Sequence, residues 1–349
     1  MGERLCAILQ EGTVDMENNY TLEITDVFKH YTQRIKGKNR FRSVKKTVKA
    51  VDGISFELKS GEIMGIIGES GCGKSTLAKL LTNLEQPTGG KILFNGVSSE
   101  EMLKNDRLQY KRMIQMVFQN PFDTFDPRNN IDKIIDETLK LHSIGKTRDE
   151  RASITQDAME KVGLTPVDDY LHRFPHELSG GQLQRISILR AMLLRPKFLV
   201  ADEPVSMLDV SVRAEIIKML QEQVRNLNTA LVFISHDINT TRYISDKIVV
   251  MYLGRIVESG ITDSVLHNPA HPYTKTLISN CASIDILEKS NPIKIEGEPP
   301  TPIDNGPGCY FAPRCYMSKD KCFKEYPEKT EIEQGHFASC HFINRDNLN

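Results

Sequence analysis

The sequence predicts an α/β fold in which short buried strands alternate with longer amphipathic segments. The alternation runs from about residue 22 to residue 257. Its clearest strands are three apolar runs, at residues 63–67, 198–201 and 231–234. Each run ends in a polar cluster. Because ligand-binding loops follow the carboxyl ends of strands in open α/β sheets, we expect the functional groups there.

The composition is that of a globular protein. The 349 residues include 45 basic and 46 acidic side chains and are 39% hydrophobic. The resulting net charge of −1 argues against a nucleic-acid partner. The longest apolar runs, such as 63–67 and 248–253, fall far short of the roughly 18 residues that a membrane-spanning helix needs. The first residues do not resemble a secretory signal, so we expect a cytoplasmic location.

Residues 68–76, GESGCGKST, fit the phosphate-binding pattern G-x-x-x-x-G-K-[ST] and follow the first strand. Glycines in such a loop let backbone N–H groups converge on phosphate oxygens, and the following helix adds its positive end. We expect Lys74 to reach the β and γ phosphates and Ser75 to bind Mg²⁺. The predicted nucleotide-binding residues are Gly68, Glu69, Ser70, Gly71, Cys72, Gly73, Lys74, Ser75 and Thr76.

The other two strands end in groups suited to nucleotide hydrolysis. Asp202 and Glu203 follow the strand at 198–201, where one carboxylate can hold Mg²⁺ and the next can orient the attacking water. His236 follows the strand at 231–234 and is placed to contact the γ phosphate. These positions predict a catalytic site rather than solvated strand ends.

A second glycine-containing loop, LSGGQ at residues 178–182, opens the amphipathic run 183–194. A serine and two glycines at a helix start can bind phosphate through backbone N–H groups. One ATP does not need two such loops from one chain. We therefore expect the loop to close over the nucleotide of another copy, through Ser179, Gly180, Gly181 and Gln182.

The order of these motifs resembles the ATPase subunit of an ATP-binding cassette transporter over about residues 20–260. The resemblance rests on the phosphate loop, VFQNP at 117–121, LSGGQ, DEP at 202–204, SMLD at 206–209 and His236. It implies a P-loop NTPase cassette with a RecA-like core, a helical signature subdomain and a small C-terminal extension that contains cysteines. In that family two cassettes pair head to tail, with each ATP between one phosphate loop and the partner's signature loop.

The resemblance also implies roles for individual residues. Glu203 would be the general base, and His236 would touch the γ phosphate. Gln119 would join Ser75 and Asp202 around Mg²⁺ and the attacking water, and would sense the membrane subunit. All hydrolytic positions are filled, so we expect a competent site.

The resemblance implies two further roles, and the sequence departs from the family pattern at two positions. Asp209 would couple the two sites, and Tyr31 is the candidate for stacking on adenine, with Phe28 as its competitor. Met207 stands where the family usually has a small residue, and Leu183 where a basic one is frequent. Neither departure removes a chemical group.

From residue 268 onward prolines recur, which predicts a linker followed by a small satellite module. Segments 268–274, 297–302 and 308–315 resemble the C-terminal extension of dipeptide, oligopeptide and nickel importer ATPases. In that subfamily two related, non-identical ATPases lie beneath two permease subunits, which an extracytoplasmic binding protein supplies. The expected division is a cassette at 20–262, with a helical subdomain inserted at about 120–196, and an extension at 263–349.

Four of the seven cysteines, Cys309, Cys315, Cys322 and Cys340, lie within the last 41 residues of the chain. An odd count in a cytoplasmic chain argues against disulfides, and four thiolates suit either a 4Fe-4S cluster or zinc. The spacing matches neither zinc ribbons nor ferredoxins. Similar tails in the importer family are associated with a 4Fe-4S cluster, which favours the cluster and leaves zinc or free thiols as alternatives. His336 and His341 flank Cys340 and could replace one of the ligands, but we expect them to be surface histidines.

These observations predict the ATP-hydrolysing subunit of an importer for peptides or a nickel chelate, peripheral at the cytoplasmic face of the membrane. The solute never touches such a subunit, so its identity cannot be read from this chain. One alternative is a soluble cassette ATPase of iron-sulfur assembly or DNA repair. Another is a phosphate-loop kinase, which has no use for residues 178–182. The basic segment 34–49, with eight Lys or Arg and no acid, fits a solvated hairpin or a contact with anionic lipid or an acidic partner.

Overall fold

The computed structural model describes residues 21–36, 43–281, 293–295, 297, 300, 303 and 305–343. Its centre is an eight-stranded sheet with the order β11-β12-β10-β9-β3-β8-β7-β6. The strands are β3 (Ile63–Ile67), β6 (Ile114–Val117), β7 (Phe198–Asp202), β8 (Ala230–Ile234), β9 (Lys247–Tyr252), β10 (Arg255–Ile261), β11 (Thr330–Glu333) and β12 (His336–Ala338). The α/β fold expected from the sequence is confirmed, and so are its three clearest strands.

The middle of this sheet is parallel and fully covered. Strands β6, β7, β8, β3 and β9 all run in one direction. Every residue of β3, β7 and β8 is buried, which explains why these strands read as continuous apolar runs rather than as alternating ones. Because the strands are parallel, the loops that follow β3, β7 and β8 meet at one edge of the sheet.

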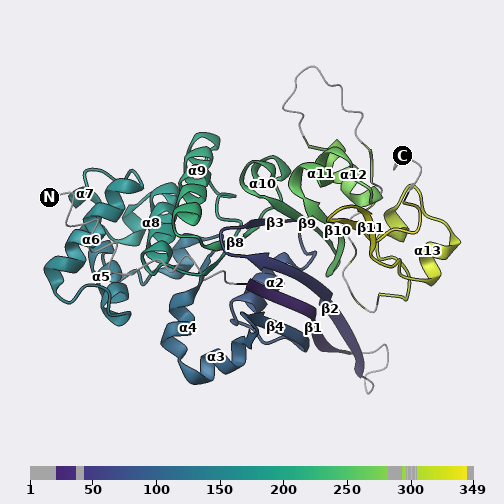
Figure 1. The fold of residues 1–349 in the computed structure, drawn as a ribbon, viewed down its shortest axis with the longest axis horizontal. Helices are drawn as coiled ribbons and strands as arrows, with labels where there is room; N and C mark the ends of the chain where they lie inside the picture. The colour runs from purple at the N-terminus through teal and green to yellow at the C-terminus, as the bar shows by residue number, and fades with distance from the viewer. Residues whose placement is uncertain are drawn as a thin grey trace.

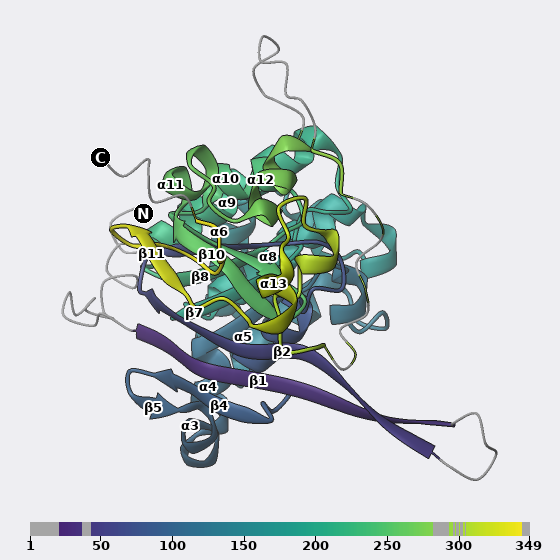
Figure 2. The same ribbon diagram turned by 90° about the vertical axis from the view of Figure 1, so that its right-hand side faces the viewer.

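A second, antiparallel sheet has the order β2-β1-β4-β5 and lies across the first one (Figure 1). Its strands are β1 (Thr21–Lys36), β2 (Ser43–Lys59), β4 (Gly89–Phe94) and β5 (Val97–Ser98). Helix α2 (Lys74–Leu81) lies between the two sheets and buries Leu77 and Leu81 against both. The basic segment belongs to the long β1–β2 hairpin, whose turn at 37–42 lies outside the described residues (Figure 2).

A group of helices lies at one end of the molecule (Figure 1). It consists of α5 (Ile131–Leu141), α6 (Arg148–Lys161), α7 (Asp168–Leu171) and α8 (Gly180–Leu193), with the 3-10 turns η1 (Pro121–Thr124) and η2 (Pro175–Glu177). Its apolar residues form one core with the sheet, for example Leu139, Met159 and Leu183 with Leu199. Around the sheet lie α3 (Ser99–Asn105), α4 (Arg107–Met113), α9 (Val210–Asn226) and α10 (Ile238–Ile244).

The C-terminal extension lies at the other end of the molecule, beside β10 (Figures 1 and 2). Its helical elements are α11 (Thr262–His267), α12 (Pro272–Ser279), η3 (Ala312–Arg314) and α13 (Asp320–Lys324). Its strand β12 pairs with β10 and so extends the central sheet. No helix among the described residues is long and apolar enough to cross a membrane.

Candidate active site

The phosphate loop connects β3 with α2. Gly73 is the residue before the helix and has a φ of 105°. A Cβ at this position would lie 2.1 Å from the backbone oxygen of Ala50 in β2, so both conformation and space require glycine. Gly71 also has a positive φ, of 78°, but nothing lies within 4 Å of the Cβ it lacks. The backbone of β2 therefore packs directly against the loop at Gly73, whereas the space beside Gly71 is empty.

Lys74 is the first residue of α2, and its side chain folds back over the loop. Its Nζ donates to the backbone oxygens of Gly68, at 2.7 Å, and Glu69, at 3.0 Å. Cys72 lies beneath the same amine, and burial raises the pKa of its thiol, which keeps it a protonated core residue. The ammonium group is thus held against the backbone of the loop.

Asp202 ends β7 directly beside the start of α2. It is 8% exposed, and its carboxylate hydrogen-bonds with Ser75, while Oδ1 has no partner. Burial and the neighbouring Glu203 raise the pKa of Asp202. A buried carboxylate oxygen without a partner, next to a serine hydroxyl, suits a hard divalent cation. These donors fit Mg²⁺, as expected from the sequence.

Glu203 meets the other two expected catalytic residues. Its Oε2 accepts a hydrogen bond from Gln119 Nε2 at 2.9 Å, and its Oε1 lies 3.2 Å from His236 Nδ1. The backbone of Glu203 has a φ of 47°, a left-handed conformation that is strained for a side chain of this kind. Its N–H donates to Ile234 at the end of β8, which fixes this conformation. Residues from three strand ends thus converge on one carboxylate.

The LSGGQ loop forms the start of α8. Ser179 and Gln182 form a capping box, in which the serine Oγ accepts from the N–H of Gln182 and the glutamine Oε1 accepts from the N–H of Ser179. Gly180 and Gly181 are the first helical residues. Asp209 is exposed before α9, between the exposed apolar side chains of Met207 and Val210.

Tyr31 rather than Phe28 lies beside the phosphate loop. The Tyr31 hydroxyl donates to Glu85 and hydrogen-bonds with Thr76, and burial together with Glu85 raises its pKa to about 12. Phe28 instead packs over Gly53 and Gly89. Contact with Thr76 places Tyr31 within reach of a nucleotide on the loop.

The structure also brings residues of the extension to the phosphate loop, which motif reasoning missed. The guanidinium of Arg314 binds both carboxylate oxygens of Glu69, at 2.6 and 3.0 Å. The hydroxyl of Tyr273 accepts the N–H of Glu69 at 2.8 Å. The sequence contained these residues within its importer-like segments but held no signal of their contact, because Glu69 and Arg314 are 245 positions apart.

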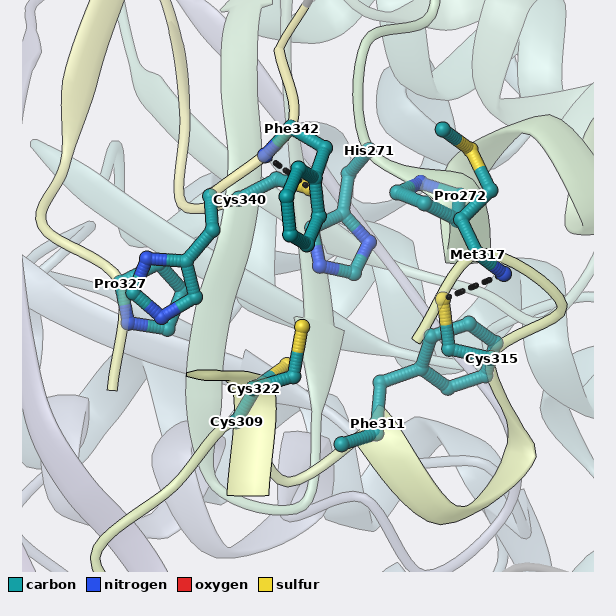
Figure 3. A pocket seen from close by; sticks show the side chains of 12 residues that line it. His271, Pro272, Cys309, Phe311, Cys315, Met317, Cys322, Pro327, Cys340 and Phe342 are labelled. Atoms are coloured by element: carbon teal, nitrogen blue, oxygen red, sulfur yellow. Dashed lines mark hydrogen bonds between the residues drawn. The ribbon is translucent and has the colours of Figure 1, made fainter. Parts of the chain in front are cut away.

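Cys309, Cys315, Cys322 and Cys340 line one cavity (Figure 3). Its other walls are largely apolar, with Phe311, Met317 and Phe342 among them. Burial raises the pKa of the Cys315 and Cys340 thiols, and it raises that of Cys309 to about 11. Within the described parts of the chain, no group of three or more His, Cys, Asp or Glu is placed to hold a metal ion. The described residues therefore do not show the 4Fe-4S or zinc site expected from the sequence.

The two histidines near Cys340 differ from each other. His341 lines the cysteine cavity and lies 2.9 Å from the backbone oxygen of Glu325. His336 is 1% exposed, and its Nε2 lies 2.8 Å from Glu258 in β10. The expectation of a surface histidine is wrong for His336, because a carboxylate on the neighbouring strand supplies the partner that burial requires.

Two family models match the chain. The family described as ABC transporter matches residues 51–206, and the one described as oligopeptide/dipeptide transporter, C-terminal region, matches residues 257–322. The oligopeptide transport ATP-binding protein OppF of Escherichia coli is 42% identical over 321 residues, which cover 91% of this chain and 95% of OppF. The dipeptide transport ATP-binding protein DppF of the same organism is 39% identical over 340 residues, which cover 97% of this chain and 98% of DppF.

Solved structures show the same fold. The cbiO1 protein from Clostridium perfringens, part of an ABC transporter complex, has 25% identity and a TM-score of 0.59 over 72% of this chain and 92% of its own. A dimeric ATP-binding cassette bound to ADP and Pi has 24% identity and a TM-score of 0.60 over 69% of this chain and 98% of its own. Both matches cover the part of the chain that a cassette alone would fill.

Proposed function

The chain belongs to the ATP-binding cassette transporter family of ATPases, and we propose that it is the ATP-hydrolysing subunit of a peptide importer. One observation carries the hydrolytic role: Glu203 is bound by Gln119 and lies beside His236, at the edge of the sheet that also presents Asp202 and the phosphate loop. Peptides are favoured over a nickel chelate because OppF and DppF, an oligopeptide and a dipeptide transport protein, match nearly the whole chain.

The phosphate loop would hold the β and γ phosphates of ATP. Its N–H groups and the start of α2 attract negative charge, and Lys74 supplies a cation at the same place. Ser75, Asp202 and Gln119 would hold Mg²⁺, which neutralises charge on the phosphate oxygens when it is bound. The unpartnered Oδ1 of Asp202 supports this assignment.

Glu203 would act as the general base. It would take a proton from the attacking water while the water oxygen bonds to the γ phosphorus and the bond to ADP breaks. Gln119 would orient the carboxylate through its amide, and His236 would contact the γ phosphate. The contacts of both residues with Glu203 support these roles. Tyr31 would stack on the adenine from β1.

A second cassette would complete the site. Ser179, Gly180, Gly181 and Gln182 would contact ATP held by the partner chain, and Asp209 would couple the two sites. The exposed apolar side chains of Met207 and Val210 beside Asp209 support a contact surface there. We expect a related but non-identical ATPase as this partner.

Transport would further require two permease subunits and an extracytoplasmic binding protein, with this chain at the cytoplasmic face of the membrane. Capture from detergent-solubilised membranes should bring permease subunits along. Capture of the ATPase without any permease would support the rival, a soluble cassette ATPase. The full-length likeness to transport ATP-binding proteins does not favour that rival.

Substitution of the base tests the hydrolytic role most directly. We expect Glu203→Gln to lower ATP hydrolysis by about 10²- to 10⁴-fold while ATP binding remains, because the amide keeps the shape of the side chain but cannot accept the proton. Phosphate release and ATP binding would be measured on the same protein. Hydrolysis by Glu203→Gln at the wild-type rate would refute the assignment of Glu203 as the general base.

We further propose that Cys309, Cys315, Cys322 and Cys340 hold a 4Fe-4S cluster. Four soft thiol donors around one largely apolar cavity fit such a group (Figure 3). When bound, the cluster would cross-link the segments through iron–thiolate bonds.

Metal analysis of anaerobically purified protein tests this proposal. We expect about four irons with matching sulfide per chain. They should be lost in Cys322→Ser and kept in the matched control Cys281→Ser, because Cys281 does not line the cavity. One zinc without sulfide, or no metal at all, would refute the cluster.

A further inference from the structure

The C-terminal extension reaches the ATP site through Glu69, the second residue of the phosphate loop. The guanidinium of Arg314 binds both carboxylate oxygens of Glu69, in the paired geometry that makes such contacts strong and directional. The Arg314 side chain is 7% exposed and that of Glu69 is 24% exposed. The pair is therefore shielded from the solvent that weakens surface ion pairs.

The backbone of Glu69 is held by the extension as well. Its N–H donates to the hydroxyl of Tyr273, which is fully buried in α12. Its backbone oxygen accepts from Lys74, the loop's own cation. Glu69 thus contacts Lys74 as well as two residues of the extension, Tyr273 and Arg314. A shift of Glu69 would therefore move one of the two backbone oxygens that hold the Lys74 ammonium group.

Arg314 lies within the cysteine segment. It ends η3, and the next residue is Cys315, which lines the cavity (Figure 3). The backbone N–H of Arg314 donates to Phe311, and its guanidinium also donates to the backbone oxygen of Gly297. The conformation of this segment therefore determines where the guanidinium lies.

From these contacts we infer that Arg314 is a positioning residue of the ATP site. Its pair with Glu69 holds the phosphate loop in the conformation that receives ATP, and it makes the affinity for ATP depend on the order of the cysteine-lined segment. The inference rests on the proposed function in one respect, namely that this loop binds ATP. Beyond that, it assigns to the nucleotide site a residue from the C-terminal extension, which is remote from the phosphate loop in the sequence.

Reversal of the charges tests the pair. We expect Arg314→Glu and Glu69→Arg each to raise the Kd for ATP of the full-length protein by roughly tenfold or more, because each leaves a like-charged pair at the loop. The double variant Glu69→Arg/Arg314→Glu should recover most of this loss. Arg314→Lys should lie between wild type and Arg314→Glu, because lysine keeps the charge but not the two-pronged contact. A purely structural role would not give recovery on charge exchange.

Control variants distinguish failure of this inference from failure of the proposed function. Arg225 and Asp246 form an ion pair on the same protein that does not involve the phosphate loop, so Arg225→Glu should leave the Kd for ATP unchanged. Wild-type affinity in Arg314→Glu, or no recovery in the double variant, would overturn the inference. Wild-type affinity in Lys74→Ala would instead overturn the proposed function, because the loop would not be the ATP site.

The dependence on the cysteine segment has its own test. We expect Cys315→Ser to weaken ATP binding, while Cys281→Ser, in the extension but away from the cavity, should not. Hydrogen exchange of the phosphate loop gives a readout that does not depend on activity. Faster exchange at Gly68 and Glu69 in Cys315→Ser is expected, and unchanged exchange together with unchanged Kd would refute the dependence.

Discussion

The ATP site and the C-terminal extension are held in place by different kinds of interaction. The site rests on β3, β7 and β8, whose residues are all buried and whose main chains pair with one another. The extension shares a short stretch of pairing between β12 and β10. Its polar anchors are side-chain pairs: Arg314 with Glu69, Tyr310 with Asp52, and His336 with Glu258. Backbone-held regions tolerate many side-chain changes, whereas each of these anchors depends on single residues.

The largest effect is expected at Gly73, where the neighbouring backbone leaves no space for a side chain. Gly73→Ala should lower the free energy of unfolding by about 4 kcal/mol, because its Cβ would meet a backbone oxygen that cannot move aside. Gly71→Ala is the matched control, since it has a positive φ but open space, and should cost only about 1 kcal/mol. Chemical denaturation of both variants measures the difference. Equal losses would show that close approach of β2 does not constrain the loop.

The next effect concerns the anchor at Asp52, which joins β2 to the extension. This carboxylate is 3% exposed and accepts hydrogen bonds from Tyr310 and Arg255 at 2.7 and 2.9 Å. Burial alone raises the pKa of Asp52, but these bonds outweigh it and the net pKa lies below its ordinary value. The ionised form is therefore favoured in the folded protein.

Asp52→Ala should lower the free energy of unfolding by about 3 kcal/mol, because it leaves the Arg255 guanidinium without its carboxylate. Tyr310→Phe removes one hydrogen bond and should cost about 1 kcal/mol. Proteolysis of the extension should accelerate in the same order. A loss in Asp52→Ala no larger than that in Tyr310→Phe would contradict the anchoring role of the carboxylate.

The same contrast explains what could be predicted from the sequence. Continuous apolar runs identify buried parallel strands, and the motifs that follow them lie at one edge of the sheet, so Glu203 and His236 could be predicted from the sequence. Gln119 was implied by the resemblance to the cassette family. Apolar runs and motifs both come from residues that are close together in the sequence. The anchors of the extension join residues far apart in the chain, and no sequence motif around Arg314 or Asp52 indicates which residue each one contacts. His336 was misjudged for the same reason, since its burial depends on Glu258, 78 positions away.

The smallest effect is expected at His336, and its size depends on pH. Burial alone lowers the pKa of His336, but the carboxylates of Glu258 and Glu333 outweigh burial and raise it above 6.5. The folded protein thus binds this proton more tightly than the unfolded chain does. The stabilisation is fully present below pH 6.5 and is lost as the pH rises through the folded pKa. We expect His336→Gln to lose about 1 kcal/mol more unfolding free energy at about pH 6 than at about pH 9. Urea denaturation at the two pH values measures this difference, and equal losses would mean that the imidazole contributes packing rather than charge, which would leave Arg314 and Asp52 as the charged anchors of the extension.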